Sequence, residues 1–204
     1  MSRLLHELSK PDSEILRPKV LGRLKITSGK LVACDPLIFH KNHFEHTIQP
    51  GAYPIIAWWN EEDGVIAGAE LKLSKSKVTE WKMATKPGQN ASELEEGFIF
   101  GYPVDTGIGC FADVEAIDKL EEIEDRLQQE LGDEFISLYD DLIDDILTEH
   151  DDEWGNCVVC EETGSNIIMF RSGYGDGFYP SYWGVDEKGD IVSIVTDFQV
   201  LYEE

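Results

Sequence analysis

Residues 113–153 read DVEAIDKLEEIEDRLQQELGDEFISLYDDLIDDILTEHDDE, and apolar side chains recur through them every three or four positions. In the first half these are Ile117, Leu120, Ile123, Leu127 and Leu131. In the second half they are Phe135, Leu138, Leu142 and Ile146, with Ile143 and Leu147 widening the stripe. This spacing is the helical period. Asp113 is placed to cap a first helix and Gly132 to end it, so the sequence predicts two amphipathic helices joined by a tight turn.

The same stretch holds most of the net charge of the chain. It contains 18 acidic residues and two basic ones, Lys119 and Arg126, for a net charge of −16 within a total of −24. The apolar stripes leave the carboxylates on the outward helix faces. A charge run of this kind is typical either of a solvated face or of a surface that attracts a cationic partner.

The segments on both sides of this stretch have the alternation of β-strands. We expect strands at residues 24–26, 31–33, 53–59, 65–73, 77–84, 158–159, 167–170, 191–196 and 198–202, the first two forming a hairpin around 27–30. The prediction is therefore an α+β fold, a mostly antiparallel β-sheet or sandwich with an inserted acidic amphipathic helical pair at about 113–150. Residues 1–20 are expected to be a lead-in with a short helix at 4–8, and residues 21–204 a single domain.

Composition excludes several classes of function. A sequence pI near 4.4 argues against direct binding to nucleic acid or to an anionic membrane, because phosphate would be repelled. No apolar run approaches the 18 residues of a membrane span. The first residues lack the apolar core and cleavage site of a signal peptide, so we expect a cytoplasmic protein.

The cysteines and histidines do not form a recognisable site. Cys157 and Cys160 make one C-x-x-C, without the second pair that zinc would need, and their strand-like surroundings favour buried thiols over a redox pair. Cys110 is a candidate nucleophile without a recognisable partner, so an ordinary buried thiol is the simpler interpretation. His40, His43 and His46 are spaced by three but lie in a loop-like context. No metal and no cofactor are predicted.

Two glycine-rich segments could form a pocket, residues 97–111 and 173–184. Their polar and aromatic side chains suggest a small-ligand site, although glycine most often serves backbone geometry and Asp most often caps or turns. The candidate ligand-binding residues are Asp105, Asp113, Ser172, Asp176, Tyr179 and Trp183. Asp197 is a further carboxylate that could join them.

A family resemblance rests on motifs within these β and loop segments. The motifs are CDP at 34–36, PGAYP at 50–54, GYPVDTG at 101–107, SGYGDGFYPSYWG at 172–184 and TDF at 196–198, with Cys110 and Asp113 between them. In this order they resemble the bacterial family catalogued as domain of unknown function 4241, over roughly residues 20 to 202. The resemblance implies a shared fold and no catalytic assignment, and its motifs lie almost entirely outside the acidic helices.

Two hypotheses about function follow. In the first, the chain is a non-catalytic acidic binding protein that engages a basic protein partner, as an inhibitor of the immunity or anti-defence type does. Its candidate partner-binding residues are Glu121, Glu122, Glu124, Asp125, Asp140, Asp141, Asp144 and Asp145. In the alternative, the chain is a small-ligand enzyme or sensor that uses the glycine-rich loops around Asp105 and Asp176. We favour the first, and a binding protein over an enzyme.

Overall fold

The computed structural model describes residues 2–201, in which twelve strands form three antiparallel sheets. The largest, sheet A, has the order β1 (Leu16–Ile26), β3 (Gly51–Asn60), β4 (Val65–Lys72), β12 (Ile191–Asp197), β11 (Ser181–Val185) and β5 (Glu80–Met83). Sheet B has the order β2 (Leu31–Cys34), β7 (Ile108–Asp113), β9 (Ser165–Arg171) and β8 (Trp154–Cys160). A small ribbon pairs β10 (Gly177–Tyr179) with β6 (Tyr102–Val104).

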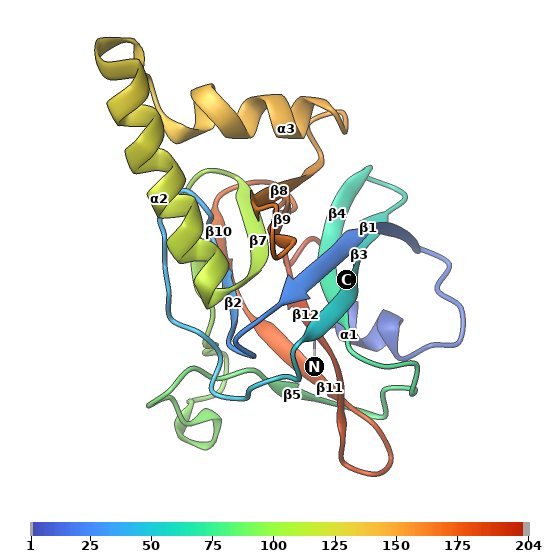
Figure 1. Ribbon diagram of the computed structural model, residues 1–204. Coiled ribbons are helices and arrows are strands. Elements are labelled where there is room, and N and C mark those ends of the chain that lie inside the picture. The colour runs from blue at the N-terminus through green and yellow to red at the C-terminus, as the bar shows by residue number, and fades with distance from the viewer. Residues whose placement is uncertain (1, 202–204) are drawn as a thin grey trace.

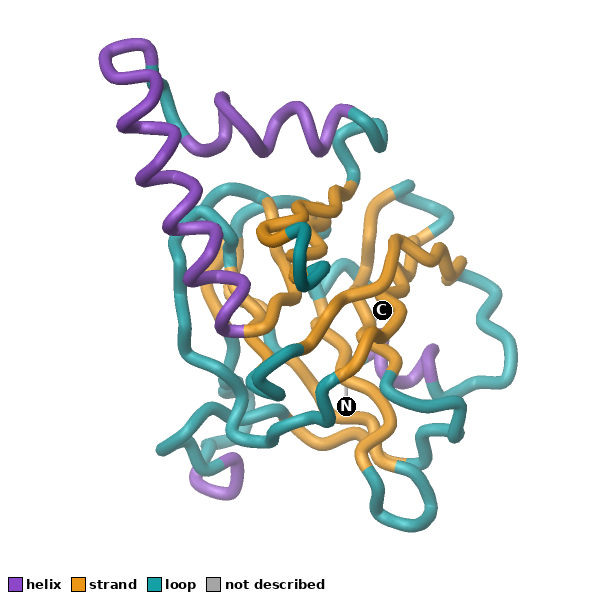
Figure 2. The backbone as a smooth tube through the Cα atoms, in the orientation of Figure 1, coloured by secondary structure: helices purple, strands orange, loops and turns teal. Residues whose placement is uncertain are grey.

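Helices are few, and most lie together on one side. They are α1 (Arg3–Leu8), α2 (Val114–Leu131) and α3 (Asp144–Thr148), with the 3₁₀ turns η1 (Ala91–Glu93) and η2 (Gly132–Glu134) and the π-helical segment η3 (Tyr139–Ile143). Figure 1 shows α2 rising away from the sheets and α3 running back toward β8. In Figure 2 these helices stand clear of most of the strands. The α+β fold and the inserted helical pair predicted from the sequence are confirmed.

Strands β2, β7 and β9 of sheet B are buried on both faces, which explains why they are almost continuously apolar, whereas the edge strand β8 alternates between buried and exposed residues. Leu31 and Ala33 of β2 pack into one hydrophobic cluster with sheet A, whereas Val32 and Cys34 pack into a second cluster with α2 and α3. Successive side chains of a strand point to opposite faces, so the alternation assigns each residue to one cluster. The helical pair is therefore the third layer of a sheet A, sheet B and helix arrangement.

The expected hairpin between 24–26 and 31–33 is wrong, because β1 and β2 belong to different sheets. β1 pairs with β3, and β2 pairs with β7. All four residues of β2 are buried, so this strand must be covered on both faces, and sheet B, between sheet A and the helices, provides that cover. The buried Asn166 joins the two sheets: its Oδ1 accepts from Lys25 N at 2.8 Å and its Nδ2 donates to Arg23 O at 3.0 Å.

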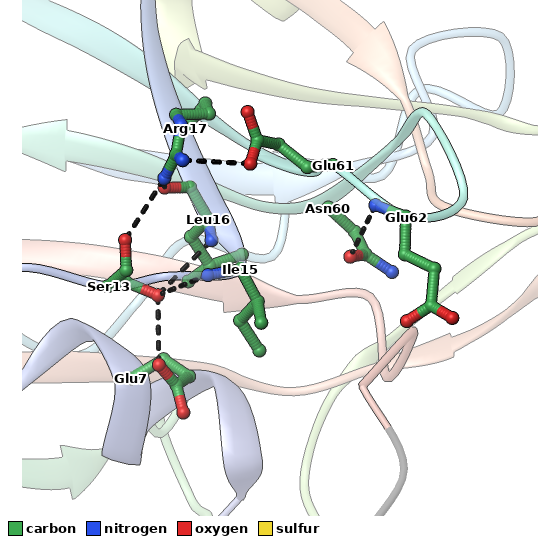
Figure 3. Close-up of polar contacts among 8 residues, drawn as sticks. All are labelled: Glu7, Ser13, Ile15, Leu16, Arg17, Asn60, Glu61 and Glu62. Atoms are coloured by element: carbon green, nitrogen blue, oxygen red, sulfur yellow. Dashed lines mark hydrogen bonds and ion pairs between the residues drawn. The ribbon is translucent and has the colours of Figure 1, made fainter.

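The N-terminal segment is packed into the protein rather than leading loosely into it. Leu4 and Leu5 of α1 are almost fully buried in the cluster shared with sheet A. Figure 3 shows how the following turn is fixed: Ser13 Oγ donates to Glu7 at 2.8 Å and accepts from Leu16 N at 3.1 Å. Arg17 then pairs with Glu61 at 2.8 Å, so that the first 20 residues contain both α1 and the start of β1.

The predicted strand at 198–202 does not form. Phe198 and Val200 are buried, but residues 198–201 are irregular, and Tyr202 lies outside the described residues. Gln199 has φ of 54°, a left-handed conformation that no strand accommodates, and its N–H is held by Asp197 Oδ1 at 2.8 Å. The side chain of Asp197 therefore ends β12 and turns the chain back over the core.

Candidate functional site: the acidic arm

The acidic arm, residues 113–153, begins at a fully buried carboxylate. Asp113 caps α2 by accepting from Glu115 N at 3.0 Å. The same carboxylate accepts from Thr27 N at 3.0 Å, Ser28 N at 2.9 Å and Ser28 Oγ at 2.8 Å. One side chain thus fixes both the start of the arm and the crossing between β1 and β2.

The burial of the apolar stripe of α2 decreases along the helix. Ile117 and Leu120 are fully buried over sheet B, as the helical period predicts. Further along, Ile123 and Leu127 are only partly buried against the same hydrophobic cluster. Leu131, at the tip, is 36 % exposed. The apolar stripe of α2 thus becomes more exposed toward the tip of the arm.

The second half of the arm departs from the predicted regular helix. Helical structure starts at Leu138, passes through the π-helical segment and continues as α3. The fully or nearly buried residues are Leu138, Ile143 and Leu147, spaced by five and then four. A π turn inserts one extra residue into the helix, which moves Ile143 and Leu147 inward and leaves Leu142 and Ile146 only partly buried.

Two of the acidic residues in this half are tied to helix capping. Ser137 Oγ accepts from Asp140 N at 3.1 Å and donates to the Asp140 carboxylate, and Asp141 Oδ2 accepts from Ile136 N at 2.9 Å and from Ser137 N at 3.2 Å. Asp140 and Asp141 therefore stabilise the start of the helix. Their substitution would test folding as well as binding.

The predicted partner-binding carboxylates lie on the outward surface of the arm. Glu121, Glu122, Asp125, Asp140, Asp144 and Asp145 are exposed, and Glu124 and Asp141 are half-buried. Burial, with the neighbouring charges of Asp125 and Glu121, raises the pKa of Glu124 above its usual value. This is the response expected of a carboxyl group crowded by like charges.

Few cations offset the negative charge of the arm. Lys41, from the loop after β2, pairs with Asp118 at 2.8 Å and with Glu121, and these hydrogen bonds raise its pKa. Lys119 pairs with Glu122 at 2.6 Å. Lys41 could not be singled out from the sequence, since it lies about 80 residues from its partners. Surface pairs such as these contribute little stability, and they leave most carboxylates of the arm without a counter-charge.

An apolar side chain stands exposed at the tip of the arm. Ile136 is 75 % exposed between the two helical halves, close in sequence to the exposed Leu131. Ile136 was not among the residues predicted from the sequence, although the adjacent Phe135 and Ile136 interrupt an otherwise acidic turn. A single exposed apolar residue is ordinary, but one inside a charged surface is a suitable anchor for a partner.

The glycine-rich loops come together, but most of the ligand-binding candidates are occupied internally. Ser172 N donates to Gly107 O at 3.2 Å, which joins the two loops. Ser172 Oγ donates to Gly175 O at 2.8 Å, and the Tyr179 hydroxyl bonds the same oxygen at 2.7 Å. Trp183 is 6 % exposed and packs edge-on against Phe44.

The carboxylates of this predicted site do not converge as a set. Asp105 and Asp176 are exposed at the same end of the ribbon, next to the paired residues Val104 and Gly177. Asp113 is buried at the start of α2, at the opposite end of β7 from the loop that carries Asp105. The two glycine-rich segments therefore form a packed loop, held by its own hydrogen bonds, and not a ligand pocket lined by converging carboxylates.

A second buried aspartate connects two of the sequence motifs. Asp35, which directly follows β2, is fully buried and accepts from Leu37 N, Asp105 N and Thr106 N, each at 3.0 Å, and from Thr106 Oγ1 at 2.8 Å. The CDP and GYPVDTG motifs therefore meet in space. Their contact fixes a loop, a role that Asp commonly fills through hydrogen bonds to backbone N–H groups.

Asp197 is buried under the N-terminal helix. Burial raises its pKa above the usual value, although hydrogen bonds from Ser2 and from the backbone of Gln199 oppose the shift. Burial and the charge of Asp197 also raise the pKa of Tyr182 to about 12. These groups belong to the packing of sheet A and α1.

Of the expected buried thiols in the C-x-x-C, Cys157 is buried, but Cys160 is only partly buried, and a hydrogen bond with Thr163 lowers its pKa. Cys110 faces Cys34 across sheet B with 3.6 Å between the sulfur atoms, and burial raises the pKa of Cys110 well above its usual value, which disfavours the nucleophilic thiolate. His40, His43 and His46 lie in irregular chain. Among residues 2–201, no three His, Cys, Asp or Glu side chains are grouped closely enough to hold a metal ion.

These features define a class: an α+β protein with two large antiparallel sheets and a small β-ribbon, in which a strongly acidic helical layer packs on the outer face of sheet B. The chain belongs to the family described as "Protein of unknown function (DUF4241)", whose sequence model matches residues 24–196. That match includes the whole acidic arm. Comparisons with curated proteins and with solved structures found no match. Within the described part of the chain, no helix has the length and apolar character needed to cross a membrane.

Proposed function

We propose that the chain is a non-catalytic binding protein whose acidic arm engages a basic protein partner, as an inhibitor of the immunity or anti-defence type does. One observation carries the proposal. The arm packs its apolar stripes inward and displays its carboxylates outward, with six of the eight predicted contact residues exposed. The charge is thereby held on a folded surface.

The charge of this surface is large enough to act at a distance. Clustered charge of one sign accelerates association with an oppositely charged partner by roughly 10- to 1,000-fold, and the gain falls with salt. Within the arm, 18 carboxylates face two basic residues, and Lys41 from outside adds one more. The field therefore favours a cationic protein and repels nucleic acid.

The tip of the arm supplies a short-range contact. Affinity in protein interfaces is concentrated in a few well-buried anchor residues, whereas rim charges mainly set the rate and specificity of association. Ile136 is the exposed apolar residue best placed for this role, and the carboxylates around it would form the rim. A partner with a positively charged cleft, as nucleases have, could receive the arm in place of phosphate. We place this encounter in the cytoplasm, as the sequence suggests.

The alternative, a small-ligand enzyme or sensor built from the glycine-rich loops, has less support. Ser172 and Tyr179 use their hydroxyl groups within the loop, and Asp113 uses both carboxylate oxygens. Asp105 and Asp176 alone among the six candidates are exposed. Two exposed carboxylates at the end of a ribbon support a ligand site less strongly than the charged surface of the arm supports a partner-binding site.

The test is affinity capture with variants matched in charge. The arm variant carries Asp125→Asn, Glu130→Gln, Asp145→Asn and Glu149→Gln, four exposed carboxylates that are not used in the capping of helices. The control variant carries Glu95→Gln, Glu96→Gln, Glu161→Gln and Glu187→Gln, which removes the same charge from exposed sites elsewhere. Each immobilised protein is exposed to lysate of the source cell at about 0.1 M and about 1 M salt, where the screening length falls from ~10 Å to ~3 Å.

We expect a basic protein, identified by mass spectrometry, to be retained at low salt by the wild type and by the control variant, and to be lost from the arm variant. Ile136→Ser should weaken its retention without changing the charge. If the arm variant retains the same proteins as the control variant, or if no basic protein is retained by the wild type, the proposal is wrong.

A further inference from the structure

A cleft of about 360 Å³ lies between the end of α1 and the strands β4 and β5 of sheet A. Two tryptophans and three lysines are among its lining residues: Trp58, Trp81, Lys10, Lys72 and Lys77. Its volume is within the range of small-molecule sites, about 300–1,000 Å³. In Figure 1, α1 and β5 lie toward the end of the molecule opposite the tip of the acidic arm.

The charge around this cleft is the reverse of that in the rest of the chain. Residues 72–82 read KLSKSKVTEWK, with four lysines and one glutamate, so this segment has a net charge of +3 in a protein of −24. Lys10 adds a further cation from the other wall. The cleft itself is lined by three lysines and one glutamate, in a protein that carries 41 acidic and 17 basic residues, and this local excess of positive charge favours an anionic ligand.

The aromatic side chains are held in place by hydrogen bonds through their indole N–H groups. Trp58 Nε1 donates to Glu70 Oε2 at 3.0 Å, and Trp81 Nε1 donates to Ser9 Oγ at 3.2 Å. Both rings are only half-buried, so they keep surface available for a ligand. Indole rings fixed in this way offer the flat apolar contact on which a planar heterocycle stacks.

Two of the three lysines at the cleft are paired with carboxylates, and one of these carboxylates is buried. Glu70 is 3 % exposed, and its second oxygen pairs with Lys72 Nζ at 3.3 Å. Lys10 pairs with Glu7 at 2.6 Å. Lys77 is exposed at the rim and has no ion pair among the described residues. A buried ion pair often adds little to the stability of a protein. Here Glu70 bonds both Trp58 and Lys72, and it thereby orients these two side chains at the cleft.

We propose that this cleft binds a free mononucleotide, with the base against Trp58 and Trp81 and the phosphate near Lys77. The ligand must be both planar and anionic, because the cleft joins aromatic surface to lysine ammonium groups. A long nucleic acid would meet the repulsion of the acidic remainder of the chain, whereas a mononucleotide lies within the positive region. This inference does not depend on the function proposed for the arm.

The probe is adenosine monophosphate, and binding is followed by quenching of tryptophan fluorescence and by calorimetry. Adenosine lacks the anion and inorganic phosphate lacks the ring, so each should bind at least about tenfold more weakly, a difference of ~1.4 kcal/mol. A short single-stranded oligothymidylate should also bind more weakly.

Two variants and one control locate the site. Lys77→Glu should reduce the affinity for adenosine monophosphate by about tenfold or more, and Trp81→Leu should reduce both the affinity and the quenching, with near-ultraviolet circular dichroism used to verify folding. Lys30→Glu makes the same charge change at an exposed lysine elsewhere and should leave the affinity unchanged. Absence of saturable binding, equal effects of Lys77→Glu and Lys30→Glu, or tighter binding of the oligothymidylate would overturn the proposal.

Discussion

Replacing Asp113 by alanine should be among the most destabilising single changes in the protein. The carboxylate is fully buried and accepts hydrogen bonds from Thr27 N, Ser28 N, Ser28 Oγ and Glu115 N at 2.8–3.0 Å. Alanine leaves three backbone N–H groups without this acceptor. The N–H groups of Thr27 and Ser28 cost about 1–3 kcal/mol each when left unsatisfied, and the lost cap on Glu115 N costs about 0.5–2 kcal/mol, so the summed loss is about 5 kcal/mol.

Asparagine at the same position should cost much less. If the amide turns its oxygen toward Thr27 N and Ser28 N, its NH₂ group can donate to Ser28 Oγ, and only the cap on Glu115 N is lost. Loss of such a cap costs about 0.5–2 kcal/mol. The structure therefore predicts an order, with Asp113→Ala far more destabilising than Asp113→Asn.

Urea denaturation followed by tryptophan fluorescence measures both variants, and Asp125→Ala on the exposed face of α2 serves as the control. We expect the control to change stability by less than about 0.5 kcal/mol. A loss of about 5 kcal/mol should lower the melting temperature by ~10–20 °C in a domain of this size. The reasoning fails if Asp113→Ala is no worse than the control, or if asparagine is as harmful as alanine.

Three further changes test other parts of the structure. Asp35→Ala should cost about 3–5 kcal/mol in the same denaturation assay, because three backbone N–H groups of residues 37, 105 and 106 lose their acceptor. Leu4→Ala should cost about 2–5 kcal/mol, since Leu4 is 1 % exposed, and an effect below about 1 kcal/mol would mean that α1 does not pack as described. Asp197→Asn should raise the melting temperature at about pH 7, and the gain should shrink in acid. The reason is that burial raises the folded-state pKa of Asp197, so the ionised form opposes folding above that pKa and protonation removes the penalty below it. A gain that grows as the pH falls would contradict this.

The parts of the fold that the sequence predicted are those governed by local patterns. The period of Ile117 and Leu120, the cap at Asp113 and the turn at Gly132 define α2 without reference to the rest of the chain. The outward position of the carboxylates follows from the same period. The apolar run at residues 167–170 of β9 also has a local explanation, because a strand covered on both faces has no need to alternate.

The features that the sequence did not predict depend on distant contacts. β1 and β2 look like a hairpin, but Asp113, more than 80 residues away, holds the connecting residues Thr27 and Ser28 between two sheets. The π-helical segment shifts the buried positions by one residue, which simple periodicity does not anticipate. The cleft combines residues of α1, β3, β4 and β5, so its lysines are recognised as a group only after folding.

The three-layer arrangement divides the residues of the arm into two sets with different freedom to change in evolution. The inward set is held by sheet B, whose outer face it covers, so its substitutions are constrained by folding. The exposed carboxylates that are not helix caps, such as Asp125 and Asp145, bear almost no part of that constraint. Mutation can therefore rewrite the charge pattern of this surface one residue at a time, and related chains can diverge in what they recognise while keeping the same scaffold.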